Sequence, residues 1–160
     1  MRNIPVNKPL FVFGTLLDPD IKEEVFGSEI KNITAQKAFA KGFTAKEYPG
    51  HSYPILLKHD GSTTQGLMLC GLSELATKRL AFYEGDLYQL QTITVEIETK
   101  HTVEAIYHAT GNIEANSFKK WTLSDWQENH KDDYLKKCRA FMTYFGKITA
   151  EEANELWEKL

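Results

Sequence analysis

Leu10-Phe11-Val12-Phe13-Gly14-Thr15-Leu16-Leu17 is an apolar run near the start of the chain, and Asp18-Pro19-Asp20 follows it directly. The run has the length of one buried strand and stops at a glycine and a threonine. Asp18 before Pro19 is typical of a helix start, with Asp18 as the N-cap. A strand that ends in this way before a helix leaves backbone N–H groups unpaired, and such a loop can hold a carboxylate or a developing oxyanion. A buried strand that simply turns at Gly14 is the alternative interpretation.

The composition is that of an ordinary globular protein. The 160 residues are 42% hydrophobic and 12% aromatic, which suits one domain with a sizeable core. The formal net charge is −3 and the chain has no block of Lys or Arg, so we expect no nucleic-acid partner. No apolar run approaches the roughly 20 residues of a membrane span, so we expect no membrane partner. Residues 1–8 contain no hydrophobic signal-peptide segment, and Cys70 and Cys138 are isolated thiols, which together indicate a cytoplasmic protein.

The first half of the chain predicts one short helix and several strands. The helix runs from Pro19 to Phe26 and is closed by Gly27. Strands are predicted at Ala38–Thr44, Ile55–Lys58 and Gln65–Cys70, with Tyr48–Pro54 as a loop. The link His59–Ser62 has the composition of a hairpin turn, so the second and third strands should pair with each other.

The second half predicts a helix, two strands and a helical end. Ser73 can cap a helix that runs to about Tyr83. Alternating apolar residues then predict two antiparallel strands, at residues 93–98 and 103–107. Ser124 with Gln127 resembles a capping box for a helix ended by Gly146, and Thr149 with Glu152 is a second box that opens a terminal helix. Strands in the middle and helices at the end indicate an α+β domain with a mostly antiparallel sheet.

Glu84 has an unusual local setting, in the segment Leu80-Ala81-Phe82-Tyr83-Glu84-Gly85-Asp86-Leu87-Tyr88. A carboxylate in the last turn of a helix faces the negative end of the helix dipole, which costs about 0.3–1 kcal/mol. Three apolar residues precede it, so part of its surroundings should be dry. Both effects raise the pKa of a carboxyl group towards the range that a proton shuttle needs. A solvated glutamate before a C-cap glycine is the alternative.

Other common site chemistries leave no signal in this sequence. The histidines form no HExxH pattern, and the cysteines have no metal-ligand spacing, so we expect no metal site. Gly14 is not followed by the Gly-Lys-Ser/Thr of a phosphate-binding loop, and no G-x-S-x-G segment is present.

Four segments match the signatures of one known family. Phe13-Gly14-Thr15-Leu16 resembles its N-terminal Tyr-Gly-Thr-Leu, and Tyr53-Pro54 resembles its middle Tyr-Pro. Phe82-Tyr83-Glu84-Gly85 with Tyr88 resembles its Phe-Glu-Gly-x-x-Tyr segment. The last segment is similar to the C-terminal helix of its plant avirulence-induced-gene branch and consists of Trp121, Trp126, His130 and Tyr134. The family is the γ-glutamylcyclotransferase-like proteins, which include γ-glutamylamine cyclotransferase, and the resemblance runs from about Pro9 to Phe145.

The resemblance implies an α+β fold around a small, partly closed, mostly antiparallel β-barrel, with flanking helices, a long C-terminal helix and a cavity at one end. We expect one domain over residues 1–160, with a core at about 9–145 and a helical extension at 147–160. The resemblance also implies an activity, which is the release of 5-oxoproline from a small γ-glutamyl substrate without a cofactor or metal.

The resemblance further implies roles for particular residues. Backbone amides at Gly14, Thr15 and Leu16 would bind the γ-glutamyl portion, and Glu84 would be the acid/base. Tyr53 and Tyr88 are candidates for lining the pocket, with simple packing as the alternative for each. Phe13 lines the same cavity and stands where the signature has Tyr, and Ala81 stands where many relatives have Asp.

The sequence leaves three functions open. In the first, Glu84 takes a proton from the substrate's α-ammonium, the freed amine attacks the γ-carbonyl, and Glu84 returns the proton to the departing amine. The second is a non-catalytic module that binds a small carboxylate, which the loss of a tyrosine at Phe13 favours. The third is a related amide hydrolase in which Glu84 activates water. The amine part of the substrate and the oligomeric state cannot be read from the sequence.

Overall fold

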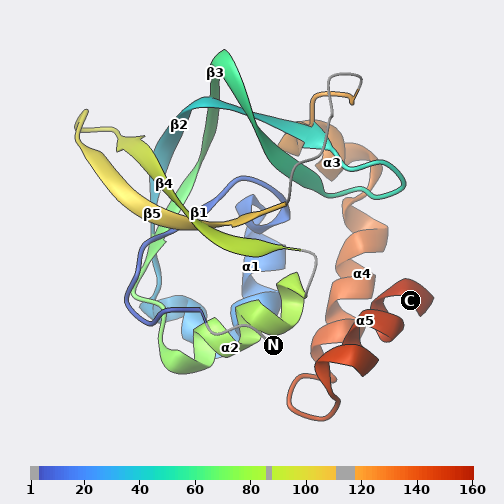
Figure 1. The fold of residues 1–160 in the computed structure, drawn as a ribbon. Coiled ribbons are helices and arrows are strands. Elements are labelled where there is room, and N and C mark those ends of the chain that lie inside the picture. The colour runs from blue at the N-terminus through green and yellow to red at the C-terminus, as the bar shows by residue number, and fades with distance from the viewer. Residues whose placement is uncertain (1–3, 86–87, 111–117) are drawn as a thin grey trace.

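Five strands close into a barrel at the centre of the fold (Figure 1). The computed structural model describes residues 4–85, 88–110 and 118–160. Around the barrel the strand order is β1-β3-β2-β4-β5, and closure comes from a parallel pairing of β1 with β5. All other neighbouring strands are antiparallel, which confirms the predicted α+β class, although the barrel is closed and not partly closed. The strands are β1 (Leu10–Val12), β2 (Thr34–Glu47), β3 (Pro54–Cys70), β4 (Gln89–Ile97) and β5 (Thr102–Ala109).

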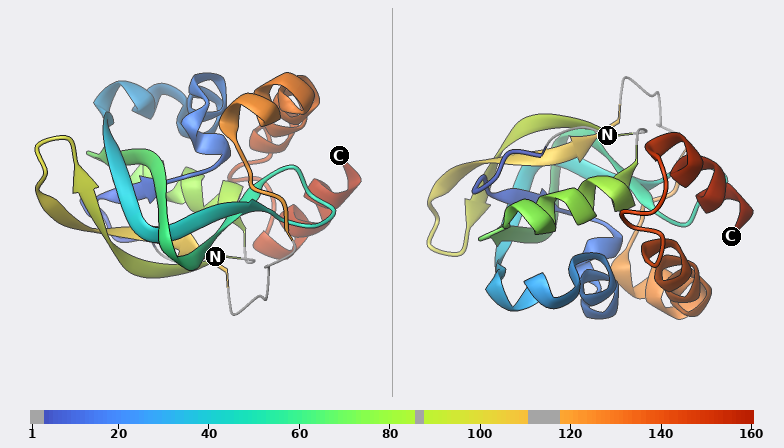
Figure 2. Two further views of the ribbon diagram at one scale, coloured as in Figure 1. Left: turned by 90° about the horizontal axis from the view of Figure 1, so that it is seen from above. Right: turned by 90° about the horizontal axis from the view of Figure 1, so that it is seen from below.

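The helices gather beneath and beside the barrel, as Figures 1 and 2 show. Helix α1 contacts both α2 and α4, and α4 contacts α5, so the helices form a continuous layer. The core lies between this layer and the barrel, and Trp126, Phe11 and Phe26 are among its largest fully buried side chains. The helices are α1 (Pro19–Phe26), α2 (Glu74–Glu84), α3 (Leu123–Asn129), α4 (Lys131–Met142) and α5 (Ala150–Lys159), with 3₁₀ turns η1 (Thr15–Leu17) and η2 (Gly27–Asn32).

The predicted start of the first helix is confirmed. The carboxylate of Asp18 accepts hydrogen bonds from the amides of Asp20 and Ile21, and Pro19 is the first helical residue. Asp18 is fully buried, and its second oxygen lies 2.9 Å from Lys131 Nζ and accepts a hydrogen bond of 2.9 Å from Gln127 Nε2. The N-cap of α1 therefore also fixes the positions of α3 and α4.

The predicted hairpin at His59–Ser62 is wrong. Residues 54–70 form one long strand, β3, which pairs along its length with β2. β2 is itself longer than predicted and offers a partner to both halves of β3. Between the pairs Lys41–Thr63 and Phe43–Lys58 the register shifts, so the turn-forming residues produce an irregularity in the ladder and no reversal. The reversal between β2 and β3 occurs in the predicted loop before Pro54.

The predicted helix from Ser124 to Gly146 is divided in two. The backbone of His130 leaves the helical region, with φ −131°, and separates α3 from α4, which ends at Met142. The predicted capping box of Ser124 and Gln127 is also wrong, because Thr122 caps α3 and the Gln127 side chain reaches Asp18 instead. The second predicted box is confirmed, since Thr149 and Glu152 cap α5 reciprocally.

The predicted strands at 93–98 and 103–107 are confirmed as β4 and β5, with Val95 opposite Val103. In the part of the chain that the structure describes, no helix is both long and apolar enough to cross a membrane. The quoted residues Met1 to Asn3, and Asp86 and Leu87 of the Glu-Gly segment, lie outside the described residues.

Candidate active site

Two adjoining cavities lie where the end of β1, the end of α2, the β2–β3 loop and the helices α4 and α5 meet. The larger has a volume of about 310 Å³ and the smaller about 40 Å³. Four residues line both cavities, namely Thr15, Tyr53, Glu84 and Tyr88. The structure brings every site residue proposed from the sequence to the wall of the smaller cavity, which is lined by Phe13, Gly14, Thr15, Leu16, Tyr53, Glu84 and Tyr88 among others.

The turn after β1 lines the smaller cavity with Gly14, Thr15 and Leu16. The amides of Leu17 and Asp18 are used within the turn, because they donate to the carbonyls of Gly14 and Thr15 at 2.9 and 3.0 Å. The two preceding amides, of Thr15 and Leu16, are the first of the turn and have no acceptor among the residues that the structure describes. That this loop binds an anion stays a prediction.

Gly14 is required by a close contact with the β2–β3 loop. A Cβ atom at this position would lie 2.9 Å from Cγ of Pro54, closer than two carbon atoms can pack. The ring of Pro54 thus rests directly on the turn, and Tyr53 and Pro54 line the small cavity together with it. The contact between Gly14 and Pro54 therefore joins two segments that lie about 40 residues apart in the sequence into one wall of the small cavity.

Glu84 ends α2 and reaches both cavities. The helix stops there because Gly85 adopts a left-handed backbone, with φ +69°, and its amide donates to Ala81 at 3.1 Å. Burial raises the pKa of Glu84 to about 8. The carboxyl group therefore exchanges its proton near neutral pH, as its setting in the sequence predicts.

Two tyrosines that the sequence analysis did not assign to the site lie beside Glu84. The hydroxyls of Thr15, Tyr83 and Tyr134 form a chain with two hydrogen bonds of 2.6 Å. Burial raises the pKa of Tyr83 and of Tyr134 above the ordinary tyrosine value, so both hydroxyls keep their protons. Tyr83 directly precedes Glu84 and was quoted only as part of a motif. Tyr134 was likewise quoted only as part of a motif, and an inward-facing position on a helix indicates core and does not by itself predict a site.

Tyr53 and Tyr88 complete the shared wall. Their ring centroids are 6.3 Å apart, and the Tyr88 hydroxyl donates to the carbonyl of Pro54 at 3.4 Å. Burial raises the pKa of Tyr53 to about 12, and the nearby Tyr48, Glu158 and Glu84 add to the increase. Burial also raises the pKa of Tyr88 well above the ordinary value. Phe13 is buried with its ring edge-on to Tyr107 and supplies an apolar surface.

The outer part of the larger cavity is formed by the β2–β3 loop on one side and α5 on the other. The loop contributes Tyr48 and His51, whose rings are stacked at 5.0 Å. Helix α5 contributes Asn154, Trp157 and Glu158. The half-buried Trp157 ring packs edge-on against Tyr83, Tyr134 and Phe141, so the last helix docks on its own chain.

Over residues 4–85, 88–110 and 118–160, no three His, Cys, Asp or Glu side chains are arranged to hold a metal ion. Both cysteines are free thiols, and burial raises the pKa of Cys138 to about 12. The polar and titratable side chains that line the two cavities include the carboxyl groups of Glu84 and Glu158, the rings of His51 and His108, the amide of Asn154 and several hydroxyls.

Comparison with known proteins gives a consistent result. The family model described as γ-glutamyl cyclotransferase, AIG2-like, matches residues 10–128. Among curated proteins, the chain is similar to Protein AIG2 A of Arabidopsis thaliana, with 22% identity over 138 residues that cover 84% of this chain and 79% of the relative. AIG2-like protein C of the same plant is also 22% identical, over 135 residues that cover 83% and 77% of the two chains.

Solved structures share the fold. A solution structure of an Arabidopsis thaliana protein superimposes with a TM-score of 0.62 at 19% identity and covers 92% of this chain and 88% of its own. A structure named γ-glutamyl cyclotransferase superimposes with a TM-score of 0.55 at 15% identity, covering 96% of this chain and 99% of its own. At these identities the likeness concerns the fold.

Proposed function

The chain belongs to the AIG2-like γ-glutamyl cyclotransferase family, and we propose that it releases 5-oxoproline from a γ-glutamyl amine or γ-glutamyl amino acid. The observation that carries the proposal is the position of Glu84. Its carboxyl group, with a pKa of about 8, lines both a small cavity, which it shares with Thr15 and Leu16 of the turn, and a larger cavity that is lined by aromatic side chains.

The two cavities suit the two ends of such a substrate. The smaller cavity has room for a few atoms only, and the amides of Thr15 and Leu16 offer donors for a carboxylate or for an oxyanion. The larger cavity has room for the amine that departs. The γ-amide bond would then lie beside Glu84, Tyr53 and Tyr88, which line both cavities.

In the proposed reaction, Glu84 acts first as a base. Its carboxylate takes a proton from the substrate's α-ammonium, and the freed amine attacks the γ-carbonyl of the same molecule to close a five-membered ring. The arriving ammonium stabilises the carboxylate, so a base that is largely protonated in the empty site ionises as the substrate binds. Intramolecular attack removes a large part of the barrier, provided that the cavity holds the folded conformer.

In the second half of the reaction, Glu84 acts as an acid. The tetrahedral intermediate carries an oxyanion, for which the N–H groups of the turn are the available donors. The oxyanion re-forms the carbonyl and the C–N bond to the amine breaks as Glu84 returns its proton to the departing nitrogen, which leaves as a neutral amine. The ring nitrogen gives up its remaining extra proton to solvent, which leaves the lactam. A carboxyl group with a pKa near 8 stays protonated at neutral pH and can therefore donate its proton when negative charge develops on the departing nitrogen. Acid/base catalysis of this kind contributes about 10²–10⁴ in rate.

The product that is formed distinguishes a cyclotransferase from an amide hydrolase and from a binding module. The purified protein is incubated with γ-glutamyl amines, γ-glutamyl amino acids and glutathione, and the products are followed by mass spectrometry. We expect 5-oxoproline together with the free amine from at least one class. Free glutamate in place of 5-oxoproline would identify an amide hydrolase, and the absence of any product while 5-oxoproline still binds would identify a binding module.

A further inference from the structure

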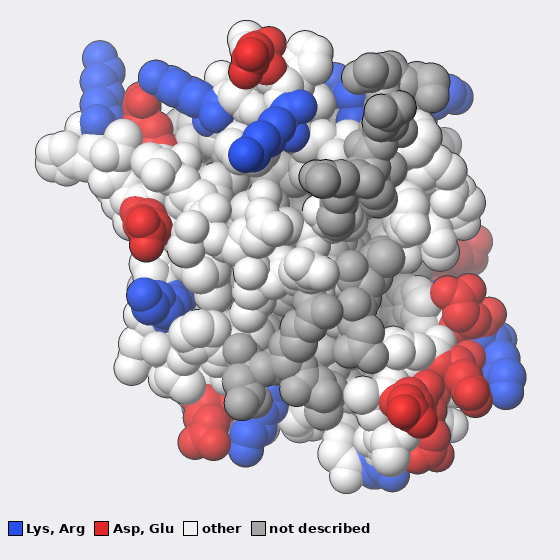
Figure 3. Space-filling model, viewed as in Figure 1, with Lys and Arg blue, Asp and Glu red and all other residues white. Residues whose placement is uncertain are grey.

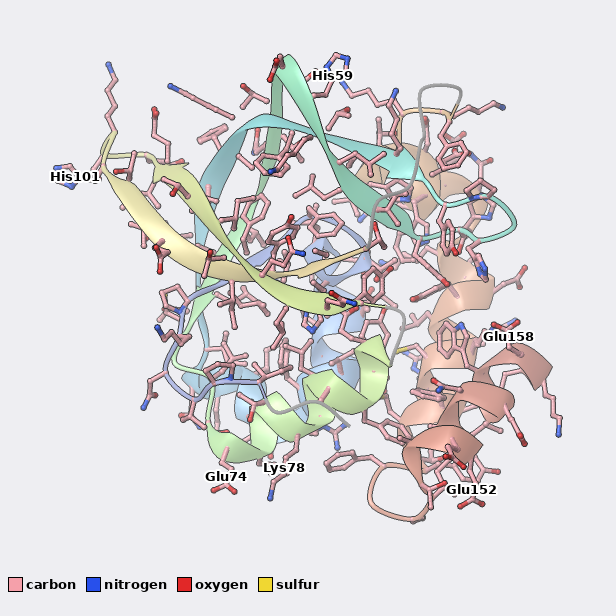
Figure 4. All side chains as sticks on the ribbon, viewed as in Figure 1. His59, Glu74, Lys78, His101, Glu152 and Glu158 are labelled. Atoms are coloured by element: carbon pink, nitrogen blue, oxygen red, sulfur yellow. The ribbon has the colours of Figure 1, made fainter. Side chains whose placement is uncertain are left out.

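The outer half of the larger cavity has a wall that the family match does not cover. Helix α5 (Ala150–Lys159) lies beyond the matched residues 10–128, yet it contributes Asn154, Trp157 and Glu158 to the lining. The end of α5 that carries Glu158 approaches the β2–β3 loop, whereas Glu152 lies near its opposite end (Figure 4). The chemistry of this wall has to be read from the residues of this chain.

The charge of the larger cavity is negative. Glu84 lies at its inner end and Glu158 at its mouth, and among the described residues that line it none is Lys or Arg. Lys137, the cation beside α5, has its Nζ atom 4.3 Å from the Trp157 ring centroid and interacts electrostatically with Glu158, although it lines a different cavity. Acidic side chains, with Lys or Arg side chains among them, gather on the surface around the C-terminal helices (Figure 3).

Aromatic rings form most of the remaining mouth. Tyr48, His51 and Tyr53 form a compact cluster with centroid distances of 4.7–6.0 Å, and Trp157 lines the same cavity from α5. Indole and phenol rings attract cations through the negative charge at their faces. A cavity mouth with aromatic rings and a carboxylate favours a cation and disfavours an anion.

We propose that the outer half of this cavity is a subsite for the leaving amine and selects an amine that carries a second, positively charged group. Glu158 pairs with that group at the mouth, and the rings of Trp157, Tyr48 and Tyr53 surround the carbon chain that leads to it. A leaving group that ends in a carboxylate meets Glu158 as a like charge and is disfavoured. The inference deepens the proposed cyclotransferase function and rests on it for the orientation of the substrate.

Three substrates of matched length test the selection. They are the γ-glutamyl amides of 1,4-diaminobutane, 1-aminopentane and 5-aminopentanoate, which end in an ammonium, a methyl group and a carboxylate. We expect kcat/KM for the diamine derivative to exceed that of the aminopentane derivative about 3–30-fold, the combined range of an exposed ion pair and a cation–π contact. The aminopentanoate derivative should be the poorest of the three.

Substitutions on α5 assign the selection to Glu158. In Glu158→Gln we expect the preference for the diamine derivative over the aminopentane derivative to fall about 2–5-fold, mainly through KM for the diamine derivative. Glu158→Lys should favour the aminopentanoate derivative. Glu155→Gln is the matched control, because Glu155 is exposed on the same helix and does not line the cavity, and it should leave all ratios unchanged. Equal use of the three substrates by the wild type, or the same loss in Glu155→Gln as in Glu158→Gln, would overturn the proposal.

A binding measurement separates this proposal from the proposed function. NMR titrations compare 1,4-diaminobutane with 1-aminopentane on the wild type and on Glu158→Gln. Tighter binding of the diamine, lost in the variant, supports the subsite even if no substrate yields 5-oxoproline, in which case only the cyclotransferase activity is refuted. Equal binding of the two amines, with turnover of γ-glutamyl substrates intact, refutes the subsite alone.

Discussion

At the scale of single residues, the site depends on a carboxyl group that the fold holds in an unfavourable place. Burial moves the pKa of Glu84 from 4.5 to about 8, so the folded chain binds a proton there that the unfolded chain releases. Between these two values the native state is therefore progressively destabilised as the pH rises. This cost is what makes the group a proton carrier near neutral pH.

Glu84→Gln should remove this pH dependence. Below about pH 4.5 the carboxyl is protonated in both states, and the variant and the wild type should have similar free energies of unfolding. As the pH rises towards 8, the wild type should lose up to about 1.4 kcal/mol per pH unit relative to the variant. Urea unfolding at pH 5, 7 and 9 measures the difference. A constant difference across this range would show that the pKa of Glu84 is not raised.

A glycine is required at position 14 because the ring of Pro54 leaves no space for a Cβ atom, and not because of its backbone angles. Gly14→Ala should place a methyl group against the rigid ring of Pro54, at 2.9 Å, and cost about 1–3 kcal/mol of stability together with most of the activity. Gly61→Ala is the control, since its Cβ meets no atom within 4 Å and the left-handed backbone alone costs about 1–2 kcal/mol. Activity that survives in Gly14→Ala as it does in Gly61→Ala would contradict the role of this turn.

At the scale of elements, one buried carboxylate organises three helices. Burial by itself raises the pKa of Asp18, but hydrogen bonds from Gln127, Lys131 and the Ile21 amide outweigh it, and the net pKa is lowered. The resulting stability is present above the ordinary value of 3.8 and is lost as the pH falls through the lowered pKa. The junction of α1, α3 and α4 should therefore loosen in acid.

Asp18→Ala tests this junction. The substitution removes the N-cap of α1 and leaves Lys131 and Gln127 without their buried partner, so we expect a loss of about 3–5 kcal/mol in the free energy of unfolding at pH 7. Asp20→Asn, which removes an exposed partner of the same lysine, should cost less than about 1 kcal/mol. Equal losses in the two variants would show that burial of Asp18 has no energetic importance.

Capping residues in the sequence correctly predicted where several helices begin. Asp18 with Pro19, Ser73, and Thr149 with Glu152 all cap helices as expected, because a cap is decided by a few neighbouring residues. The predictions were wrong where a contact with a residue far away in the sequence determines the local structure. The turn-like residues 59–62 stay in β3 because β2 is long enough to pair on both sides of them, and Gln127 turns away from its own helix towards Asp18.

At the scale of the whole molecule, the site joins four segments that are far apart in the sequence. The resemblance of short motifs was enough to place Gly14, Tyr53, Glu84 and Tyr88 around one cavity. It was not enough to show the hydroxyl chain through Tyr134 or the wall formed by α5, because both depend on how the C-terminal helices dock. Helical periodicity marks a residue as facing inwards and does not distinguish core from cavity.

The acid/base role of Glu84 is the central claim, and one comparison tests it most directly. Turnover of a substrate accepted by the wild type is measured in Glu84→Gln and in Glu74→Gln, a control at the exposed start of the same helix. Binding of 5-oxoproline is measured alongside. We predict a loss of at least about 10²-fold in kcat for Glu84→Gln, with binding nearly intact, and no loss for Glu74→Gln. Turnover by Glu84→Gln at a rate close to that of the wild type would contradict the account.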